Sequence, residues 1–152
     1  MTKKRSKNRK PPDEEYHLQA RIKQCVTSSY YISASDDVSN DEAILDFLAE
    51  IIEVTPKMPQ YVGVDINCSL MSARTYRANN NGLSLGNPLL LYMRLSRDIR
   101  LFSAYLPSDV FWALSSDLKD GRLKHVEAWF DKPRYGSGKL RSLYFSEEPD
   151  PE

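Results

Sequence analysis

The sequence predicts an α+β domain: a mostly antiparallel sheet of about six strands, in the order β-α-β-β-β-α-β-β, with two helices on one face. Three observations support this fold class. Several segments alternate apolar and polar side chains, which is typical of half-buried strands. Two segments repeat apolar side chains at helical spacing. The connections between segments are short, which favours antiparallel neighbours.

The chain has 152 residues, 41% of them apolar and 28% charged, which is enough for one domain with a conventional core. Residues 1–15 contain six basic side chains within the first ten and almost no apolar ones, so we expect a disordered basic tail. Residues 147–152 contain four acidic side chains and form a predicted acidic tail. The single domain is therefore expected at residues 16–146.

The first predicted strand covers residues 17–28. Leu18, Ala20, Ile22 and Val26 would face inward, while the residues between them are polar. Residues 33–37 are then expected to form a polar connection.

The first helix is predicted at residues 39–54. Ser39 and Glu42 have the spacing of a capping box, and Asp41 adds negative charge at the positive end of the helix dipole. Pro56 would end the helix. The apolar face that follows the cap comprises Ile44, Leu45, Phe47, Leu48, Ile51 and Ile52.

Residues 61–71 alternate again and predict a second strand, whose inward side chains are Val62, Val64, Ile66, Cys68 and Leu70. Residues 72–88 form the longest predicted loop, because they contain three consecutive Asn, two Gly and Pro88.

The last part of the chain carries the strongest local patterns. Residues 89–95 predict a strand with Leu89, Leu91, Met93 and Leu95 on one side, and residues 96–99 supply a turn. A helix is expected from Ser108 to just before Gly121. Its predicted inner stripe is Val110, Phe111, Leu114 and Leu118, and after it Val126, Ala128 and Phe130 are expected to pair with Leu143 and Phe145 across a turn at 133–138.

The sequence contains no catalytic motif that predicts a reaction. His125 and Glu127 would share one side of a strand, which is compatible with a general-base pair or with an exposed polar pair. The segment from Gly136 to Lys139 resembles the end of a phosphate-binding loop, but Leu140 stands where such a loop needs Ser or Thr. Cys25 and Cys68 lack the spacing of metal ligands. We therefore expect neither a metal nor a cofactor, and binding rather than catalysis.

Two kinds of partner fit the composition. Residues 57–146 hold thirteen basic and seven acidic side chains, whereas residues 17–56 hold two and seven. Arginines near flat aromatic rings suit either an interface with another protein or contact with nucleic acid, to which the basic residues 1–10 would add a non-specific arm. The candidate binding residues are Arg74, Tyr76, Arg77, Tyr92, Arg94, Arg97, Arg100, Trp129, Arg134 and Tyr135.

A protein partner, including a second copy of the chain, is the primary expectation, and nucleic acid is the alternative. Exposed aromatic side chains are common in protein interfaces, and further candidates here are Tyr30, Tyr31, Tyr105 and Trp112. No apolar run approaches the roughly twenty residues that a membrane span needs. The expected location is the cytoplasm.

Overall fold

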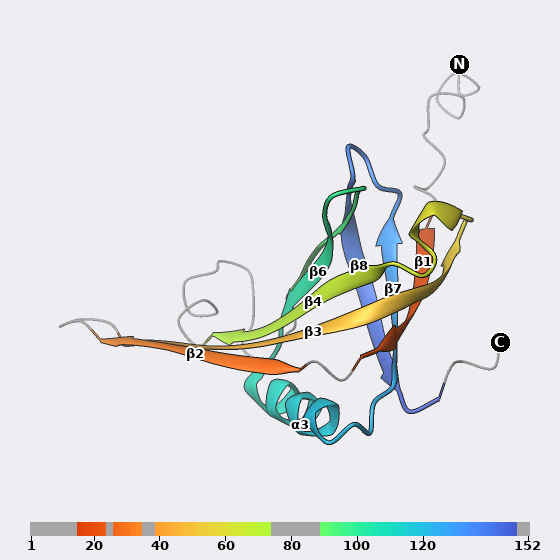
Figure 1. Ribbon diagram of the computed structural model, residues 1–152. Coiled ribbons are helices and arrows are strands. Elements are labelled where there is room, and N and C mark those ends of the chain that lie inside the picture. The colour runs from red at the N-terminus through yellow and green to blue at the C-terminus, as the bar shows by residue number, and fades with distance from the viewer. Residues whose placement is uncertain (1–14, 24–25, 35–38, 74–88, 149–152) are drawn as a thin grey trace, which may run out of the picture.

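The computed structural model of the chain describes residues 15–23, 26–34, 39–73 and 89–148. Within these residues the chain forms a closed barrel of seven strands (Figure 1). The strand order around it is β1 (Glu15–Ile22), β7 (His125–Asp131), β8 (Ser137–Ser146), β5 (Leu89–Leu95), β6 (Arg100–Tyr105), β4 (Asp65–Ala73) and β3 (Ser39–Thr55). Pairing of β3 with β1 closes the barrel, and all pairs are antiparallel except β4 with β6.

An eighth strand, β2 (Thr27–Ala34), lies outside the barrel and pairs with the first half of β3. Together these two segments extend away from the barrel, on the left of Figure 1. The one α-helix of the described residues, α3 (Ser108–Lys119), connects β6 to β7 at the lower end of the barrel. A short 3₁₀ helix, η1 (Pro59–Tyr61), lies between β3 and β4.

The predicted fold class is therefore wrong. The described chain is not an α+β sheet with two helices on one face, because its sheet curves round and closes on itself. A closed barrel buries its apolar side chains inside and needs no helical layer to cover them. The predicted sheet would have had one face without helices; in the structure this face is the outer surface of the barrel.

The largest single correction concerns residues 39–54, which form strand β3 and not a helix. Their apolar side chains fit both periods: the helical stripe is real, but Ala43, Leu45, Phe47, Ala49 and Ile51 also alternate, and these five are buried. A helix here would leave β1, β2 and β4 without their common neighbour. Pairing on both edges therefore outweighs the capping-box signal at Ser39 and Glu42.

A β-bulge adjusts the end of β3 to the barrel. Ala20 pairs with Ile51 and Gln19 with Glu53, so Ile52 has no opposite residue on β1. Because of this extra residue, the buried positions of β3 change from odd to even numbers. Ile51 is buried, Ile52 is exposed, and Val54 is the next buried residue.

The remaining elements agree better with the sequence patterns. β1 ends at Ile22, earlier than expected, and the predicted connection at 33–37 overlaps the end of β2. Ile66, Cys68 and Leu70 face inward as predicted, but Val62 precedes the strand and is exposed. The other inward predictions confirmed by burial are Leu18, Ala20, Met93, Leu95, Phe111, Leu118, Val126, Ala128 and Phe130, while Leu143 and Phe145 are partly buried and pack against this core.

The helix and the last hairpin lie close to their predicted positions. Pro107 and not Ser108 occupies the N-cap, and Val110 is exposed while Ser115 takes a buried position. Val126 pairs with Phe145 and Ala128 with Leu143, as expected. Of the predicted tails, residue 15 belongs to β1, and residues 1–14 and 149–152 lie outside the described residues, as does most of the predicted loop.

Gly138 offers a test of the barrel geometry. A Cβ added there would overlap the backbone carbonyl of Asp131 on the paired strand. We expect Gly138→Ala to lower the free energy of unfolding by about 2–3 kcal/mol, measured by urea denaturation, because backbone cannot move aside. Gly63→Ala is the control: its added Cβ meets nothing within 4 Å, and the positive φ of 84° alone costs about 1 kcal/mol. Equal losses in the two variants would contradict the close approach of β8 to β7.

Candidate functional site

Five of the ten predicted binding residues come together on one surface of the barrel. Tyr92 and Arg94 lie on β5, Arg97 in the β5–β6 turn, and Arg134 and Tyr135 in the β7–β8 turn. Both turns are at the same end, the top of Figure 1. Together with Lys139 on β8, these five residues define what we call the arginine surface.

Backbone contacts hold the two turns of the arginine surface together. The amide of Leu95 donates to the carbonyl of Gly136 over 2.8 Å, and the amide of Ser96 donates to the carbonyl of Ile99 over 2.8 Å within its own turn. On the paired strands Tyr92 lies opposite Lys139, and Arg94 lies opposite Ser137. Their neighbour Met93 faces the core, so alternation directs Tyr92 and Arg94 outward.

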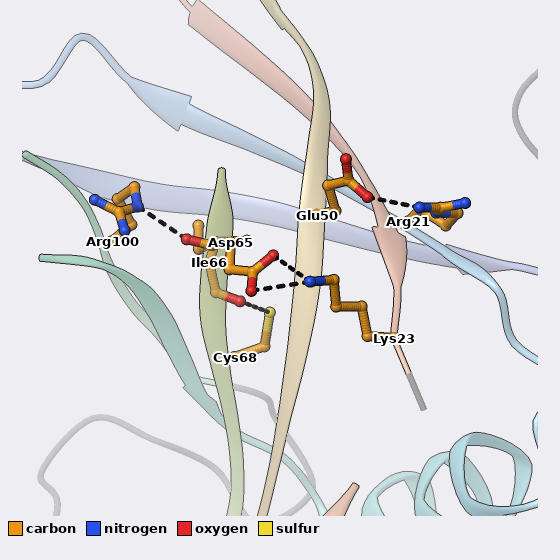
Figure 2. A network of polar contacts seen from close by, with 7 residues as sticks. All are labelled: Arg21, Lys23, Glu50, Asp65, Ile66, Cys68 and Arg100. Atoms are coloured by element: carbon orange, nitrogen blue, oxygen red, sulfur yellow. Dashed lines mark hydrogen bonds and ion pairs between the residues drawn. The ribbon is translucent and has the colours of Figure 1, made fainter. Parts of the chain in front are cut away.

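Arg100 was predicted to bind a partner, but the fold uses it internally. Its Nε donates to the carbonyl of Asp65 over 2.8 Å (Figure 2). Its Nη1 donates to the carbonyl of Arg97 over 2.6 Å. These bonds connect β6 to the start of β4 and brace the β5–β6 turn. Arg100 is therefore a structural residue, whereas no such role is seen for the side chain of Arg97 within the described residues.

The remaining predicted residues do not join the arginine surface. Arg74, Tyr76 and Arg77 lie outside the described residues. Trp129 is on β7, where its ring stacks on the imidazole of His17 with centroids 4.6 Å apart and planes 20° apart.

The predicted pairing of His125 with Glu127 is replaced by a contact from β1. The Nε2 of His17 lies 2.7 Å from Oε1 of Glu127, and Gln19 Nε2 lies 3.5 Å from the same oxygen. Sequence reasoning missed His17 because 110 positions separate it from Glu127 and no local pattern links them.

Glu127 is an unusual acidic residue in this barrel. Its neighbours Val126 and Ala128 face the core, so its side chain is on the outer face, yet only 3% of it is exposed. Oε2 is buried and has no hydrogen-bond partner among the described residues. A buried carboxylate of this kind depends on the one strong contact that it has, which is the imidazole of His17.

Two basic side chains of β1 and the residue after it form ion pairs with acidic residues of the same chain. Arg21 contacts Glu50 at 2.6 Å, and Lys23 contacts Asp65 at 2.8 Å, as Figure 2 shows. The hydrogen bond to Asp65 raises the pKa of Lys23. A shallow hollow beside these residues, between the end of β1 and the end of α3, is thus lined in part by cations that already have partners.

A second surface was only partly foreseen. On β2 every side chain from Thr27 to Ile32 is exposed, including Tyr30, Tyr31 and Ile32 at 58%, 57% and 80%. The ring of Tyr30 stacks on that of Trp112 from α3, with centroids 6.1 Å apart. We call β2 together with Trp112 the edge surface. Tyr30, Tyr31 and Trp112 were expected interface candidates, but Ile32 was not.

Cys68 is a free thiol in the core and not a reactive group. It points into the barrel from β4, is completely buried, and lies 3.8 Å from the carbonyl of Ile66 (Figure 2). Burial raises the pKa of Cys68 well above its ordinary value, and the charge of Asp46 adds to the effect.

The described residues contain no group of three or more His, Cys, Asp or Glu side chains placed to hold a metal ion. No helix in the described part of the chain has the length and apolar character needed to cross a membrane. Neither protein-family models nor curated proteins nor solved structures provide a match to this chain. The function of this chain is therefore inferred from the arginine surface and the edge surface.

The contact between His17 and Glu127 can be tested by a double-mutant cycle. We expect His17→Ala to lower the free energy of unfolding by about 2–3 kcal/mol, because it leaves a buried carboxylate without its main partner. Glu127→Gln removes the charge, so His17→Ala should cost much less in that background. Urea denaturation of the four proteins at neutral pH measures the coupling. Additive effects would show that the two side chains do not stabilise each other.

The burial of Cys68 predicts its reactivity. In a Cys25→Ser variant the Cys68 thiol is the only one left, so a colorimetric thiol reagent reports on this site alone. We expect no reaction over the time in which a small-molecule thiol reacts completely, because the thiolate is disfavoured and inaccessible. In denaturant one thiol per chain should react. Rapid labelling without denaturant would contradict the placement of Cys68 in the core.

Proposed function

We propose that this protein is a non-enzymatic protein-binding module, and that it binds through the edge surface. One observation supports this proposal above the others: β2 is a strand exposed on both faces and unpaired along its outer edge within the described structure. A strand in a monomeric protein normally buries one face. Here the exposed side chains include two tyrosines and an isoleucine.

The composition of β2 strengthens this proposal. Natural proteins protect free sheet edges with charged side chains, proline or bulges. Thr27–Ala34 contains no charged residue and no proline, and its pairing with β3 is regular throughout. The backbone donors and acceptors of this edge are thus available to another strand, as in recognition by strand addition.

The occupant that we propose is β2 of a second copy of this chain. An uncharged strand neither repels its own copy nor attracts a charged partner, and antiparallel pairing of two identical edges closes a symmetric dimer. The ring of Trp112 on α3, which is 46% exposed and stacks on Tyr30, extends the contact area. The aromatic stack of Tyr30 on Trp112 would then lie at the interface and not in water.

The expected interface of mixed arginines and aromatics is thereby revised. We now propose the protein interface on the edge surface, which has aromatic side chains but no arginine. The predicted residues Tyr92, Arg94, Arg97, Arg134 and Tyr135 lie instead on the arginine surface. The cytoplasm remains the compartment that we propose, since the core holds Cys68 as a free thiol.

The solution mass tests this proposal. We expect light scattering on a sizing column, over about a hundredfold range of protein concentration, to give the mass of a dimer at the concentrated end. At the dilute end the mass should fall to that of the monomer. Ile32→Lys should yield a monomer, since a charged side chain on the edge strand opposes pairing of this edge with a second strand. Circular dichroism should show an unchanged strand content, because the Ile32 side chain is 80% exposed.

Val62→Lys is the matched control. Val62 is also an exposed aliphatic residue, at 49%, but it follows η1 at the far end of β3 from β2. This variant should remain a dimer. A wild-type protein that is monomeric at every concentration, or an Ile32→Lys variant that is still a dimer, would overturn the proposal.

A further inference from the structure

We propose that the arginine surface binds single-stranded nucleic acid, by contacts of its cations with phosphates and of Tyr135 and Tyr92 with bases. This surface is apart from β2, so the inference does not depend on the proposed dimer. It rests on the local charge and on the backbone conformation of one tyrosine.

The charge of the surface is strongly positive. Arg94 and Lys139 lie on the adjacent strands β5 and β8, while Arg97 and Arg134 lie in the turn after β5 and the turn before β8. The β5–β6 turn adds one acidic residue, Asp98. Within the described part of the chain, neither Arg94 nor Arg97 has a hydrogen bond or ion pair from its side chain. Cations without an internal partner are available to phosphates.

A nearby carboxylate, Asp131, offsets only part of this charge: its charge acts on Lys139, but both its oxygens are bonded to another cation. Asp131 precedes the β7–β8 turn and is held by Arg141, with distances of 2.9 and 2.8 Å from Nε and Nη2 to its two oxygens. This hydrogen bonding lowers the pKa of Asp131 and fixes the ion pair. The carboxylate is thus occupied by a cation outside the arginine surface.

Tyr135 occupies a backbone position that suits tyrosine poorly. It is the one described residue other than glycine with a positive φ, at 54°, and Gly136 follows with φ 80°. Arg134 and Ser137 bond to each other's backbone around them, which defines a two-residue hairpin turn with both central residues left-handed. Asn-Gly is the favoured pair in such a turn, and a bulky residue at the first position is strained.

The ring of Tyr135 gains no packing in return for this strain. Its exposure is 106%, so the side chain stands fully in solvent. A residue that is unfavourable for the turn and contributes nothing to the core suggests a role outside folding. A fully exposed ring beside arginines is suited to stacking on an unpaired base.

The second ring lies where a neighbouring nucleotide could reach it. Tyr92 is 46% exposed and is directly opposite Lys139, two residues along β8 from Ser137 at the turn. Two residues of a strand span about 7 Å. The two tyrosine rings with cations between them favour single-stranded nucleic acid as the ligand. In a duplex the faces of the bases are covered by their neighbours, and an acidic peptide has no bases to stack on the rings.

Fluorescence anisotropy with a labelled oligothymidylate of about twenty nucleotides tests the inference. The full-length protein should bind at low salt, and binding should weaken steeply as salt increases. Tyr135→Asn should weaken binding about tenfold, since a stacked ring contributes most of a base contact. The same variant should be at least as stable as the wild type, because Asn-Gly suits the turn. Loss of binding with retained stability separates this role from a structural one.

Two further variants sharpen the test. Arg97→Gln should reduce the slope of log affinity against log salt by about 0.7, the value for one phosphate contact on a single strand, and it leaves intact the backbone carbonyl that Arg100 uses. Tyr144→Asn removes a tyrosine of similar exposure to Tyr92, 51%, at the other end of β8 and should not change binding. All variants retain the basic residues 1–10, so differences between them report on the barrel.

Several results would overturn the inference. They are an absence of binding at low salt, a Tyr135→Asn variant that binds as tightly as the wild type, and equal affinity for a duplex of the same length. Displacement of the oligonucleotide by polyglutamate as effectively as by unlabelled oligonucleotide would show a surface that selects only negative charge.

Discussion

The structure depends on the pairing of β1 with β3, because this contact converts a curved sheet into a closed barrel. Leu18 opposite Val54 and Ala20 opposite Ile51 bring four apolar side chains into the core along that seam. The bulge at Ile52 bends the second half of the 17-residue strand β3 along the barrel, while the first half pairs with β2 without irregularity. Closure removes the free edges of seven strands, and within the described residues it leaves β2 as the one strand outside.

The same geometry separates the two candidate surfaces. The β5–β6 and β7–β8 turns lie at one end of the barrel, whereas β2 extends in another direction (Figure 1). Arg97 and Tyr135 belong to these two turns, and Tyr31 and Ile32 belong to β2. Some of the acidic residues of the first half form surface ion pairs with basic residues of the same half, as Glu50 does with Arg21. The neutral total charge therefore conceals a surface on which arginines are concentrated. Self-association and nucleic-acid binding, as proposed here, do not compete for the same residues.

Prediction from sequence succeeded where neighbours along the chain decide the conformation. The hairpin of β7 and β8 and the helix α3 have turn residues and apolar spacing that admit one interpretation, and both lie close to where they were expected. Prediction failed at residues 39–54, where Ala43, Leu45, Phe47, Ala49 and Ile51 fit a strand as well as the stripe with Ile44 and Leu48 fits a helix. Only the presence of partners on both edges distinguishes the two, and these partners include strands that lie far away in sequence.

By itself the sequence determined much of the composition of the core, the final helix and hairpin, and which residue types could bind a partner, because these follow from local spacing and side-chain chemistry. The tertiary structure decided how those residues are used. Arg97 and Arg100 are chemically identical and three positions apart, yet Arg100 donates to backbone carbonyls while Arg97 extends into solvent. His17 and not His125 became the partner of Glu127, because β1 pairs with β7 in the sheet. Contacts of this kind depend on which strands become neighbours, and that is settled by the pairing of the whole sheet.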